Sequence, residues 1–270
     1  MAIAAEEAGN IDVWVMGTVG RNRRRITSES AADRFPLWTP DGKALLFFSV
    51  RARGRGVYRK LIDTDGAEEP LLVDSARLIV PFSWSADGQT LLTAELMGVN
   101  FDIGVVTLKG EVTRKSLLGS PFQEAGPEVS PDGKWMAYSS NEGGGAAGVY
   151  VRPFPNVTSG VEQISTGGSL SSEPHWTRGG RELVYRSGDA IMAVPIELSP
   201  TFRAGTPTVL FKGTYFNETG AQWDVTPDGN RFLMLKPAGA SGAAAGDQTR
   251  PQIVLVQNWF EELKRLVPVK

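Results

Sequence analysis

Short apolar runs bounded by turn-forming residues recur along the whole chain. The five clearest runs cover residues 44–48, 90–93, 134–138, 182–185 and 231–235. Short runs of aliphatic and aromatic side chains between turn formers are typical of β-strands. Because no helical period of apolar residues occurs inside the repeated units, the pattern predicts an all-β protein.

A four-residue turn precedes each of these runs and sets the period of the chain. The turns cover residues 39–42, 85–88, 130–133, 177–180 and 226–229, and their last glycines follow one another at intervals of 46, 45, 47 and 49 residues. Most of these turns place Asp third and Gly fourth, as a turn between antiparallel strands favours. At 177–180 the aspartate is replaced by Gly179, which we interpret as structural drift.

Two further strand-like runs complete the repeated unit. The third run of the unit covers residues 56–59, 101–106, 148–151 and 190–194. The fourth run covers residues 69–72, 113–117, 162–165 and 208–211. Four antiparallel strands in a unit of this length make one propeller blade. We therefore predict an all-β fold, a β-propeller of about six four-stranded antiparallel blades with incomplete first and last blades, followed by a short C-terminal helix.

The two ends of the chain align with parts of a blade. Residues 1–6, 11–16 and 24–27 align with second, third and fourth strands, and residues 253–256 align with a third strand. The predicted propeller covers 1–257, with a partial blade at 1–28, blades at 29–73, 74–118, 119–166 and 167–212, a partial blade at 213–257, and a helix and tail at 258–270. We expect the C-terminal part of a longer chain, and the alternative is a complete six-bladed ring closed by strand exchange.

Composition limits the possible partners. The 270 residues carry a net charge of −2, so we expect no nucleic-acid partner, and the length suits a single monomeric propeller domain. No apolar run approaches the length of a membrane span, and we expect no membrane insertion by this chain. The chain has no cysteine, which excludes disulfides and thiolate metal sites. We expect no cofactor.

The repeats resemble two groups of bacterial propellers. The Ser/Thr-Pro-Asp-Gly turn after Trp, with strands at 12–16 and 24–27, resembles the WD-like repeat of TolB-type proteins. Residues 126–138, 149–155, 180–185 and 258–266 are similar to the C-terminal propeller of bacterial serine/threonine protein kinases, abundant in acidobacteria. The second resemblance implies a sensor or interaction module linked to a kinase domain, and the first implies a periplasmic envelope component.

The resemblance does not extend to kinase chemistry within this chain. The Gly-rich phosphate loop, the His-Arg-Asp motif and the Asp-Phe-Gly motif are absent from the sequence. Kinase activity would therefore belong to a longer parent protein. Its compartment would be periplasmic if a signal or transmembrane segment precedes the propeller, and cytoplasmic otherwise.

One row of positions on the first strands is a candidate for chemistry. The single histidine, His175, precedes Trp176, and the equivalent positions in other blades hold Leu37, Ser83, Glu128 and Asp224. First strands line the central channel of a propeller, so these side chains either pack the blades together or form a small-ligand or cation site. A channel metal, as in propeller lactonases, is the alternative to a non-catalytic scaffold, and it needs at least three converging ligands.

The loops that join second to third strands and fourth to first strands share one face. This face is our first choice for binding a protein or peptide partner, and its candidate residues, together with two from the channel, are Asp33, Arg34, Arg51, Arg53, Glu124, Glu173, His175 and Asp224. The sequence lacks a Gly-x-Ser-x-Gly elbow, and residues 167–171 miss its last glycine. We therefore predict that the protein is not an enzyme.

Overall fold

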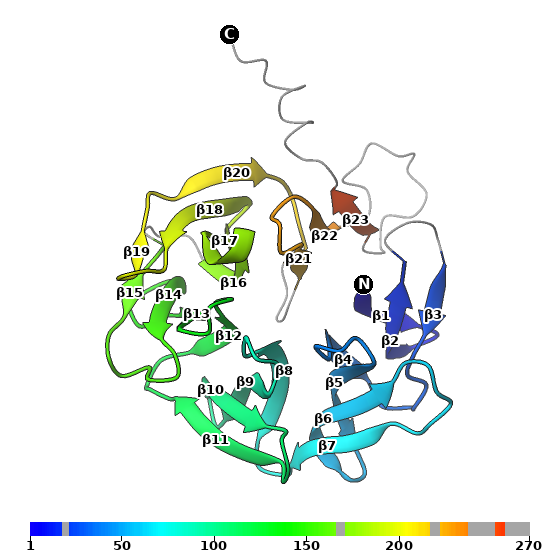
Figure 1. Cartoon of the computed structure of the whole chain (residues 1–270). Coiled ribbons are helices and arrows are strands. Elements are labelled where there is room, and N and C mark those ends of the chain that lie inside the picture. Colours follow the sequence, from blue (N-terminus) through cyan, green and yellow to red (C-terminus); the bar gives the residue numbers. More distant parts are fainter. Residues whose placement is uncertain (18–21, 166–170, 217–221, 237–251, 257–270) are drawn as a thin grey trace.

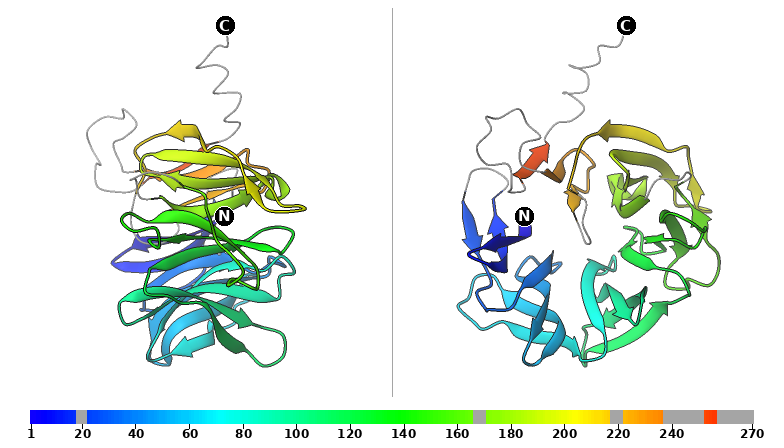
Figure 2. Two further views of the ribbon diagram at one scale, coloured as in Figure 1. Left: turned by 90° about the vertical axis from the view of Figure 1, so that its left-hand side faces the viewer. Right: turned by 180° about the vertical axis from the view of Figure 1, so that it is seen from behind.

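Six antiparallel sheets follow one another around a ring in the computed structural model (Figure 1). The structure describes residues 1–17, 22–165, 171–216, 222–236 and 252–256. The predicted C-terminal helix and tail, 258–270, lie outside these residues. Seen from behind in Figure 2, the same ring has its sheets arranged like the blades of a propeller.

The first three sheets take up the N-terminal half of the ring. Sheet one has three strands, β1 (Ala2–Glu7), β2 (Asn10–Met16) and β3 (Arg23–Arg25). Sheet two has four, β4 (Asp33–Trp38), β5 (Ala44–Arg51), β6 (Gly54–Leu61) and β7 (Glu69–Asp74). Sheet three has four, β8 (Leu78–Trp84), β9 (Thr90–Met97), β10 (Asn100–Thr107) and β11 (Thr113–Leu118).

The last three sheets complete the ring. Sheet four contains β12 (Glu124–Val129), β13 (Trp135–Ser140), β14 (Gly148–Pro153) and β15 (Glu162–Gln163). Sheet five contains β16 (Ser171–Thr177), β17 (Glu182–Ser187), β18 (Ala190–Glu197), β19 (Arg203–Ala204) and β20 (Thr208–Lys212), with a 3-10 turn at Arg178–Gly180. Sheet six contains β21 (Trp223–Val225), β22 (Phe232–Lys236) and β23 (Gln252–Val256). The predicted all-β propeller is confirmed, and among the described residues its first and last sheets have three strands each.

The second strand of each central sheet is buried on both faces. Successive side chains of a strand point to opposite sides, so neighbouring residues face different blades. In β5, Leu45 packs toward sheet one and Leu46 packs toward sheet three. In β17, Leu183 packs toward sheet four and Val184 toward sheet six. This is why the second strands read as continuous apolar runs rather than as alternating ones.

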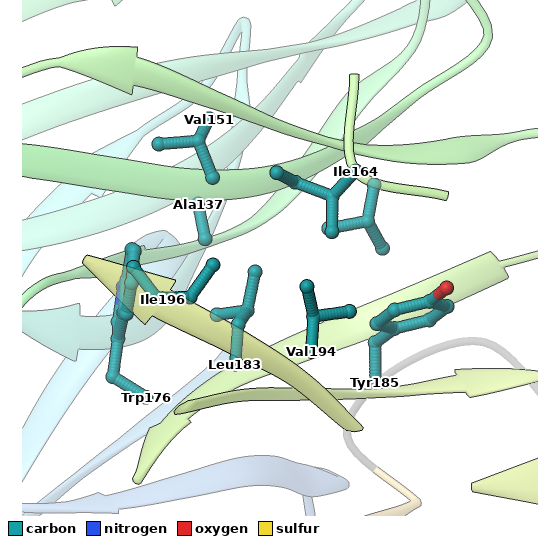
Figure 3. Packing of buried hydrophobic residues seen from close by; sticks show 9 residues of the cluster. Ala137, Val151, Ile164, Trp176, Leu183, Tyr185, Val194 and Ile196 are labelled. Atoms are coloured by element: carbon teal, nitrogen blue, oxygen red, sulfur yellow. The ribbon is translucent and has the colours of Figure 1, made fainter. Parts of the chain in front are cut away.

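The core is divided among the spaces between consecutive sheets. Figure 3 shows the space between sheets four and five, where Ala137 and Val151 face Leu183 and Val194. Trp176, at the inner end of this cluster, is 6% exposed. Each blade is therefore held mainly by its two neighbours, and the ring sets the spacing of the first strands.

The repeated turns also contact one another around the ring. Gly88 closes its turn with a φ of +67°, and a Cβ at this position would lie 3.1 Å from the side chain of Pro40 in the preceding turn. Gly180 has a φ of +85°, and a Cβ there would lie 3.2 Å from Pro131. Glycine at the end of the turn thus serves both the left-handed backbone and the close packing of neighbouring blades.

The turn at 177–180 replaces its missing aspartate with a residue from the next strand. In the standard turn, Thr39 donates a hydrogen bond to Asp41 at 2.7 Å. In sheet five, Thr177 donates instead to Glu182 at 2.9 Å, and Arg178 also contacts this carboxylate at 3.0 Å. The interpretation of this turn as structural drift therefore missed a compensating carboxylate.

Candidate functional site

The first strands form the inner edge of the ring, and most of them carry the same irregularity (Figure 1). Register shifts break the pairing of β4, β8, β12 and β16 with their second strands. At this bulge Phe35 and Glu173 have φ values of 55° and 54°, and Gly126 has 62°. A bulge re-aims the side chains that follow it. In three of the four bulged strands, those side chains are Ser83, Glu128 and His175.

Each of these three side chains reaches toward the next blade. Ser83 donates a hydrogen bond to the backbone oxygen of Pro127 at 2.6 Å. Glu128 accepts from the backbone N–H of Trp176 at 2.8 Å, and His175 lies edge-on to the Trp223 ring with centroids 4.6 Å apart. These contacts support the prediction that this row of residues packs the blades together, because each contact joins two consecutive sheets at the inner edge.

Glu128 and His175 form the best-ordered polar pair of the inner edge. Nδ1 of His175 lies 2.8 Å from Oε2 of Glu128, while Oε1 accepts the Trp176 backbone N–H. The indole N–H of Trp176 also donates to the backbone oxygen of Glu128 at 3.0 Å. Both partners of the ion pair are only partly exposed, 21% for His175 and 25% for Glu128.

The charge of His175 is set by its carboxylate neighbours. Burial by itself lowers the pKa of His175, but the charge and hydrogen bond of Glu128, and then the charges of Asp224 and Glu173, outweigh burial and raise this pKa to about 9. The imidazole is therefore protonated at neutral pH. Its Nδ1 donates to Glu128, and its Nε2 is buried with no hydrogen-bond partner in the described part of the chain.

Glu173 and Asp224 complete a group that we call the inner cluster: Glu128, Glu173, His175 and Asp224. Glu173 accepts the backbone N–H of Gln222 at 3.1 Å through Oε1, and the Trp223 side chain also stabilises its carboxylate by a hydrogen bond. Burial raises the pKa of Glu173 to about 7, opposed mainly by the positive charge of His175. Burial also raises the pKa of Asp224, although this residue is exposed to solvent.

The candidates of the loop face divide into structural and free residues. Asp33 is fully buried and accepts hydrogen bonds at 2.8 and 3.1 Å from Arg51, which also pairs with Glu68. The Arg51 guanidinium lies 4.6 Å above the Tyr58 ring. Both residues therefore hold sheet two together, and the prediction that they bind a partner gains no support. Arg34 and Arg53 are exposed.

Glu124 is buried at the start of β12 and is held by the hydroxyl of Ser120. Burial raises the pKa of Glu124 above its usual value. The structure places Glu124 outside the inner cluster, at the loop-face end of sheet four. Sequence reasoning did not indicate two ion pairs, that of Glu95 with Arg114 and that of Glu142 with Arg152. The partners of these pairs lie 19 and 10 residues apart, so no local motif marks them.

The expected geometry of a channel metal does not occur in the part of the chain that the structure describes. No three His, Asp or Glu side chains converge there at a distance suited to one metal ion. A hollow of about 370 Å³ lies on the opposite face, between the turns of sheets two and three, and is lined by residues such as Pro40, Arg59 and Trp84. The residues that line this hollow include no member of the inner cluster.

Among the described residues, no helix is long and apolar enough to cross a membrane.

Comparison with known structures identifies the fold. TolB from Acinetobacter baumannii superposes with a TM-score of 0.68 and 20% identity, over 92% of this chain and 57% of that chain. The chain has a TolB-like propeller fold. A puromycin-hydrolyzing peptidase from Mycobacterium tuberculosis superposes with a TM-score of 0.60 and 16% identity, over 85% of this chain and 40% of that chain. An oligogalacturonate lyase in complex with manganese superposes with a TM-score of 0.57 and 15% identity, over 94% of this chain and 69% of that chain.

Comparison with curated sequences gives a relative named as a peptidase. The chain is 27% identical over 140 residues to the "Uncharacterized peptidase YuxL" of Bacillus subtilis (strain 168), and the matched segment covers 52% of this chain and 20% of YuxL. The chain thus spans about a fifth of the length of the curated relative it matches. No family model matches the chain.

These findings correct the prediction that the protein is not an enzyme. The curated relative is named as a peptidase, and the structural neighbours include a peptidase and a lyase, so this propeller fold is one that enzymes use. The prediction took the lack of a nucleophile motif within 270 residues as lack of activity. The matched peptidases are much longer than this chain, so that motif need not lie in the matched segment. The kinase-linked sensor role stays a prediction.

Proposed function

We propose that this propeller binds peptides at the centre of its ring and serves a peptidase-type enzyme as its substrate-binding domain. The observation that carries the proposal is the inner cluster, in which the Glu128–His175 pair joins two consecutive sheets and Glu173 reaches the third through the Gln222 N–H. Elsewhere the contacts between sheets are dominated by apolar side chains. The sequence likeness to a peptidase supports a peptide as the ligand.

The inner edge has the chemistry that peptide binding needs. Binding sites combine fixed polar groups with apolar walls. Here the polar groups are fixed because Glu128 uses both of its oxygens within the protein. Trp223 supplies a buried aromatic wall beside His175. In this proposal the propeller supplies binding and access, and the residues that break the bond lie in the part of such an enzyme that the propeller does not include.

Peptide binding is tested by isothermal titration calorimetry of the 270-residue chain with short peptides of mixed sequence. We expect saturable one-to-one binding that becomes about tenfold weaker in His175→Ala, equivalent to about 1.4 kcal/mol. Lys115→Ala, on the exposed outer strand β11, is the matched control and should bind as the parent does. Absence of binding by every peptide, or equal weakening by both variants, would contradict the proposal.

A second candidate function, binding of a protein partner on the loop face, rests on an exposed apolar patch. Val99 is 84% exposed and Met97 is 55% exposed in the hairpin that joins β9 to β10, and Phe122 is 39% exposed in the loop before β12. The side-chain amide of Gln123 donates to the backbone oxygen of Val99 at 3.0 Å and accepts from Phe101 N–H at 2.9 Å. These bonds hold the hairpin and the loop together, so the patch is pre-formed.

The partner surface is tested by affinity capture with Val99→Glu. We expect this variant to lose a partner that the parent protein retains, because a charge in an apolar interface is costly to desolvate. Val112→Glu is the control, since Val112 is also exposed but lies between β10 and β11, on the face opposite the loop face. A partner retained by Val99→Glu, or lost by both variants, would contradict this surface.

A further inference from the structure

We propose that the hollow between the turns of sheets two and three binds a small organic carboxylate, with the charge of the ligand on Arg59 and its apolar part against Trp84. Arg59 lies on β6 and Trp84 ends β8, so the two sides of the hollow come from consecutive sheets. The hollow lies on the face opposite the loop face. This site is independent of the peptide binding proposed at the inner cluster.

Arg59 occupies a position that is apolar in the other central blades. It pairs across its sheet with Leu46, the fourth residue after the turn glycine. The residues paired with this fourth position in sheets three, four and five are Val105, Val151 and Ala193, and each packs in the apolar space toward the following sheet. Residues directly opposite each other in an antiparallel pair share one face, so Arg59 faces sheet three as Leu46 does. Sheet two thus places a cation where packing alone favours an apolar side chain.

The guanidinium of Arg59 has no partner of its own among the described residues. Arg59 is half-buried, its Nε is buried without a hydrogen bond, and the ion pairs of the described chain do not include it. Arg51 and Arg152, which are also largely buried, each pair with a carboxylate. Because an unpaired cation is costly to remove from water, a carboxylate is the partner that Arg59 lacks.

The hollow provides space for a ligand beside Arg59. Its volume is about 370 Å³. Ligand pockets run from about 300 to 1,000 Å³, so this one suits a small molecule. The apolar wall comes from Trp84, Leu61 and Leu108. The indole N–H of Trp84 already donates to the backbone oxygen of Trp38 at 2.8 Å, which fixes the ring. The hollow therefore combines an unpaired cation with a fixed apolar wall.

The charges that line the hollow favour a ligand with one negative charge. Arg59 and Lys43 are positive, and Asp41 is negative. Hydrogen bonds from the Thr39 hydroxyl at 2.7 Å and from the Lys43 backbone N–H at 3.1 Å lower the pKa of Asp41. Asp41 is therefore ionised at neutral pH, and the lining keeps one net positive charge. A monocarboxylate balances this charge, whereas a phosphate group carries about −1.5 to −2 at pH 7 and would exceed it.

The experiment titrates the 270-residue chain at pH 7 with phenylacetate and with its neutral amide, phenylacetamide. Backbone amide signals are followed by two-dimensional NMR. Gly88 closes a turn that lines the hollow, and Gly133 closes the equivalent turn of sheet four and does not line it. We expect phenylacetate to shift the Gly88 signal saturably, to leave the Gly133 signal in place, and to bind about tenfold more tightly than phenylacetamide. Equal binding of the acid and the amide, equal shifts at both glycines, or no saturable shift at Gly88 would overturn the proposal.

Arg55 provides a matched control for Arg59. Both lie on β6 four residues apart and on the same face of the sheet, and the Nε of each is buried without a hydrogen-bond partner in the described chain. Arg55 donates through Nη2 to the backbone oxygen of Ser75 at 3.1 Å and does not line the hollow. Arg59→Met should remove the preference for phenylacetate over the amide, and Arg55→Met should keep it. A preference that survives in Arg59→Met, or that both variants lose, would contradict the assignment.

Unfolding separates a binding role of Arg59 from a structural one. Arg59→Met places an apolar side chain where the other central blades have one, so the free variant should be at least as stable as the parent in urea. Phenylacetate should raise the urea midpoint of the parent and leave that of Arg59→Met unchanged. A variant that is clearly less stable than the parent would assign Arg59 to holding sheets two and three together, and would overturn the proposal.

One further probe identifies the source of the carboxylate. The dipeptide Ac-Ala-Phe with a free carboxyl end presents the same charge and ring at the end of a peptide. Binding tighter than that of phenylacetate would assign the hollow to a peptide's carboxyl terminus, and weaker binding would assign it to a free acid. Both results support a carboxylate site, provided that Arg59→Met removes the binding.

Discussion

At the scale of single residues, the Glu128–His175 pair shows how a common inter-blade position becomes a charged one. The equivalent residue Ser83 makes a single hydrogen bond to the next blade, whereas Glu128 makes an ion pair and accepts a backbone N–H. The sequence singled out His175 because it is the one histidine of the chain. The sequence did not indicate that Glu128 would be its partner, because 47 residues separate the two side chains.

Replacing Glu128 should lower the pKa of His175. Glu128→Gln removes the charge that contributes most to raising this pKa, so we expect it to fall from about 9 by at least one unit. Because the chain has one histidine, a proton NMR titration follows a single imidazole signal. Glu124→Gln serves as the control. A His175 pKa that stays near 9 in Glu128→Gln would show that the assigned cause is wrong.

The inner cluster also makes folding stability depend on pH. The pKa of His175 is about 9 in the folded protein against 6.5 ordinarily, and that of Glu173 is about 7 against 4.5. The stabilisation from protonated His175 is fully present below about pH 6.5 and is lost as the pH rises through 9. Raising the pH from about 4.5 through 7 likewise destabilises the fold, because ionisation of buried Glu173 is unfavourable. Between pH 6 and 9 the folded state therefore binds more protons than the unfolded state.

We expect the free energy of unfolding to fall by on the order of 2 kcal/mol between pH 6 and pH 9. Urea unfolding at the two pH values measures it. The aspartates of the repeated turns do not interfere, because hydrogen bonds lower the pKa of Asp41, Asp87 and Asp228, which therefore titrate at acidic pH. His175→Gln should weaken the dependence, and stability that rises toward pH 9 would be incompatible with the inner cluster as described.

At the scale of elements, the repeated turn and its following strand act as one unit. The Thr or Ser of the turn bonds to a carboxylate, which in four turns comes from the turn itself: Asp41, Asp87, Asp132 and Asp228. In sheet five it comes from Glu182, the first residue of β17. The bond is therefore kept even where the sequence pattern is broken.

Glu182→Ala should destabilise the protein by about 1 kcal/mol, because it leaves the Thr177 hydroxyl and the Arg178 side chain without this carboxylate. Urea unfolding measures the change. Glu162→Ala, an exposed carboxylate at β15, is the control and should have little effect. If the two variants unfold alike, Glu182 does not replace the missing aspartate.

The turns and apolar runs were sufficient to predict the strands, because each depends on residues close in sequence. The bulges of the first strands were not predicted. Phe35 and Glu173 take the same left-handed conformation with unlike side chains, so the residue type at the bulge does not mark it. Arg51 illustrates the same limit, since its role in an ion pair with Asp33 depends on a contact 18 residues away.

At the scale of the whole molecule, tryptophan side chains join neighbouring first strands at two of the junctions between sheets. The indole N–H of Trp84 donates to the backbone oxygen of Trp38 at 2.8 Å, and that of Trp176 donates to Glu128 at 3.0 Å. The periodic Trp before the turn was visible in the sequence. Its bond to the preceding blade was not, because that bond depends on how consecutive blades are packed.

Trp176→Phe should lower the free energy of unfolding by about 1 to 3 kcal/mol, because it removes a buried hydrogen bond and part of a core side chain. Chemical unfolding followed by circular dichroism measures the loss. Trp84→Phe should have a similar effect, since Trp84 makes the equivalent bond between sheets three and two. A loss confined to one of the two would show that the ring is not held by a repeated contact.

The central claim is that a peptide binds at the inner cluster, and His175 is a built-in reporter for it. The most direct measurement is the imidazole proton signal of His175 during titration with Ac-Ala-Lys-Ala-NH2 at pH 8. We expect a saturable change in chemical shift, which Glu173→Gln and Asp224→Asn together abolish and Glu124→Gln leaves intact. A His175 signal that does not move while calorimetry detects the peptide binding elsewhere, or no binding at all, would contradict the account.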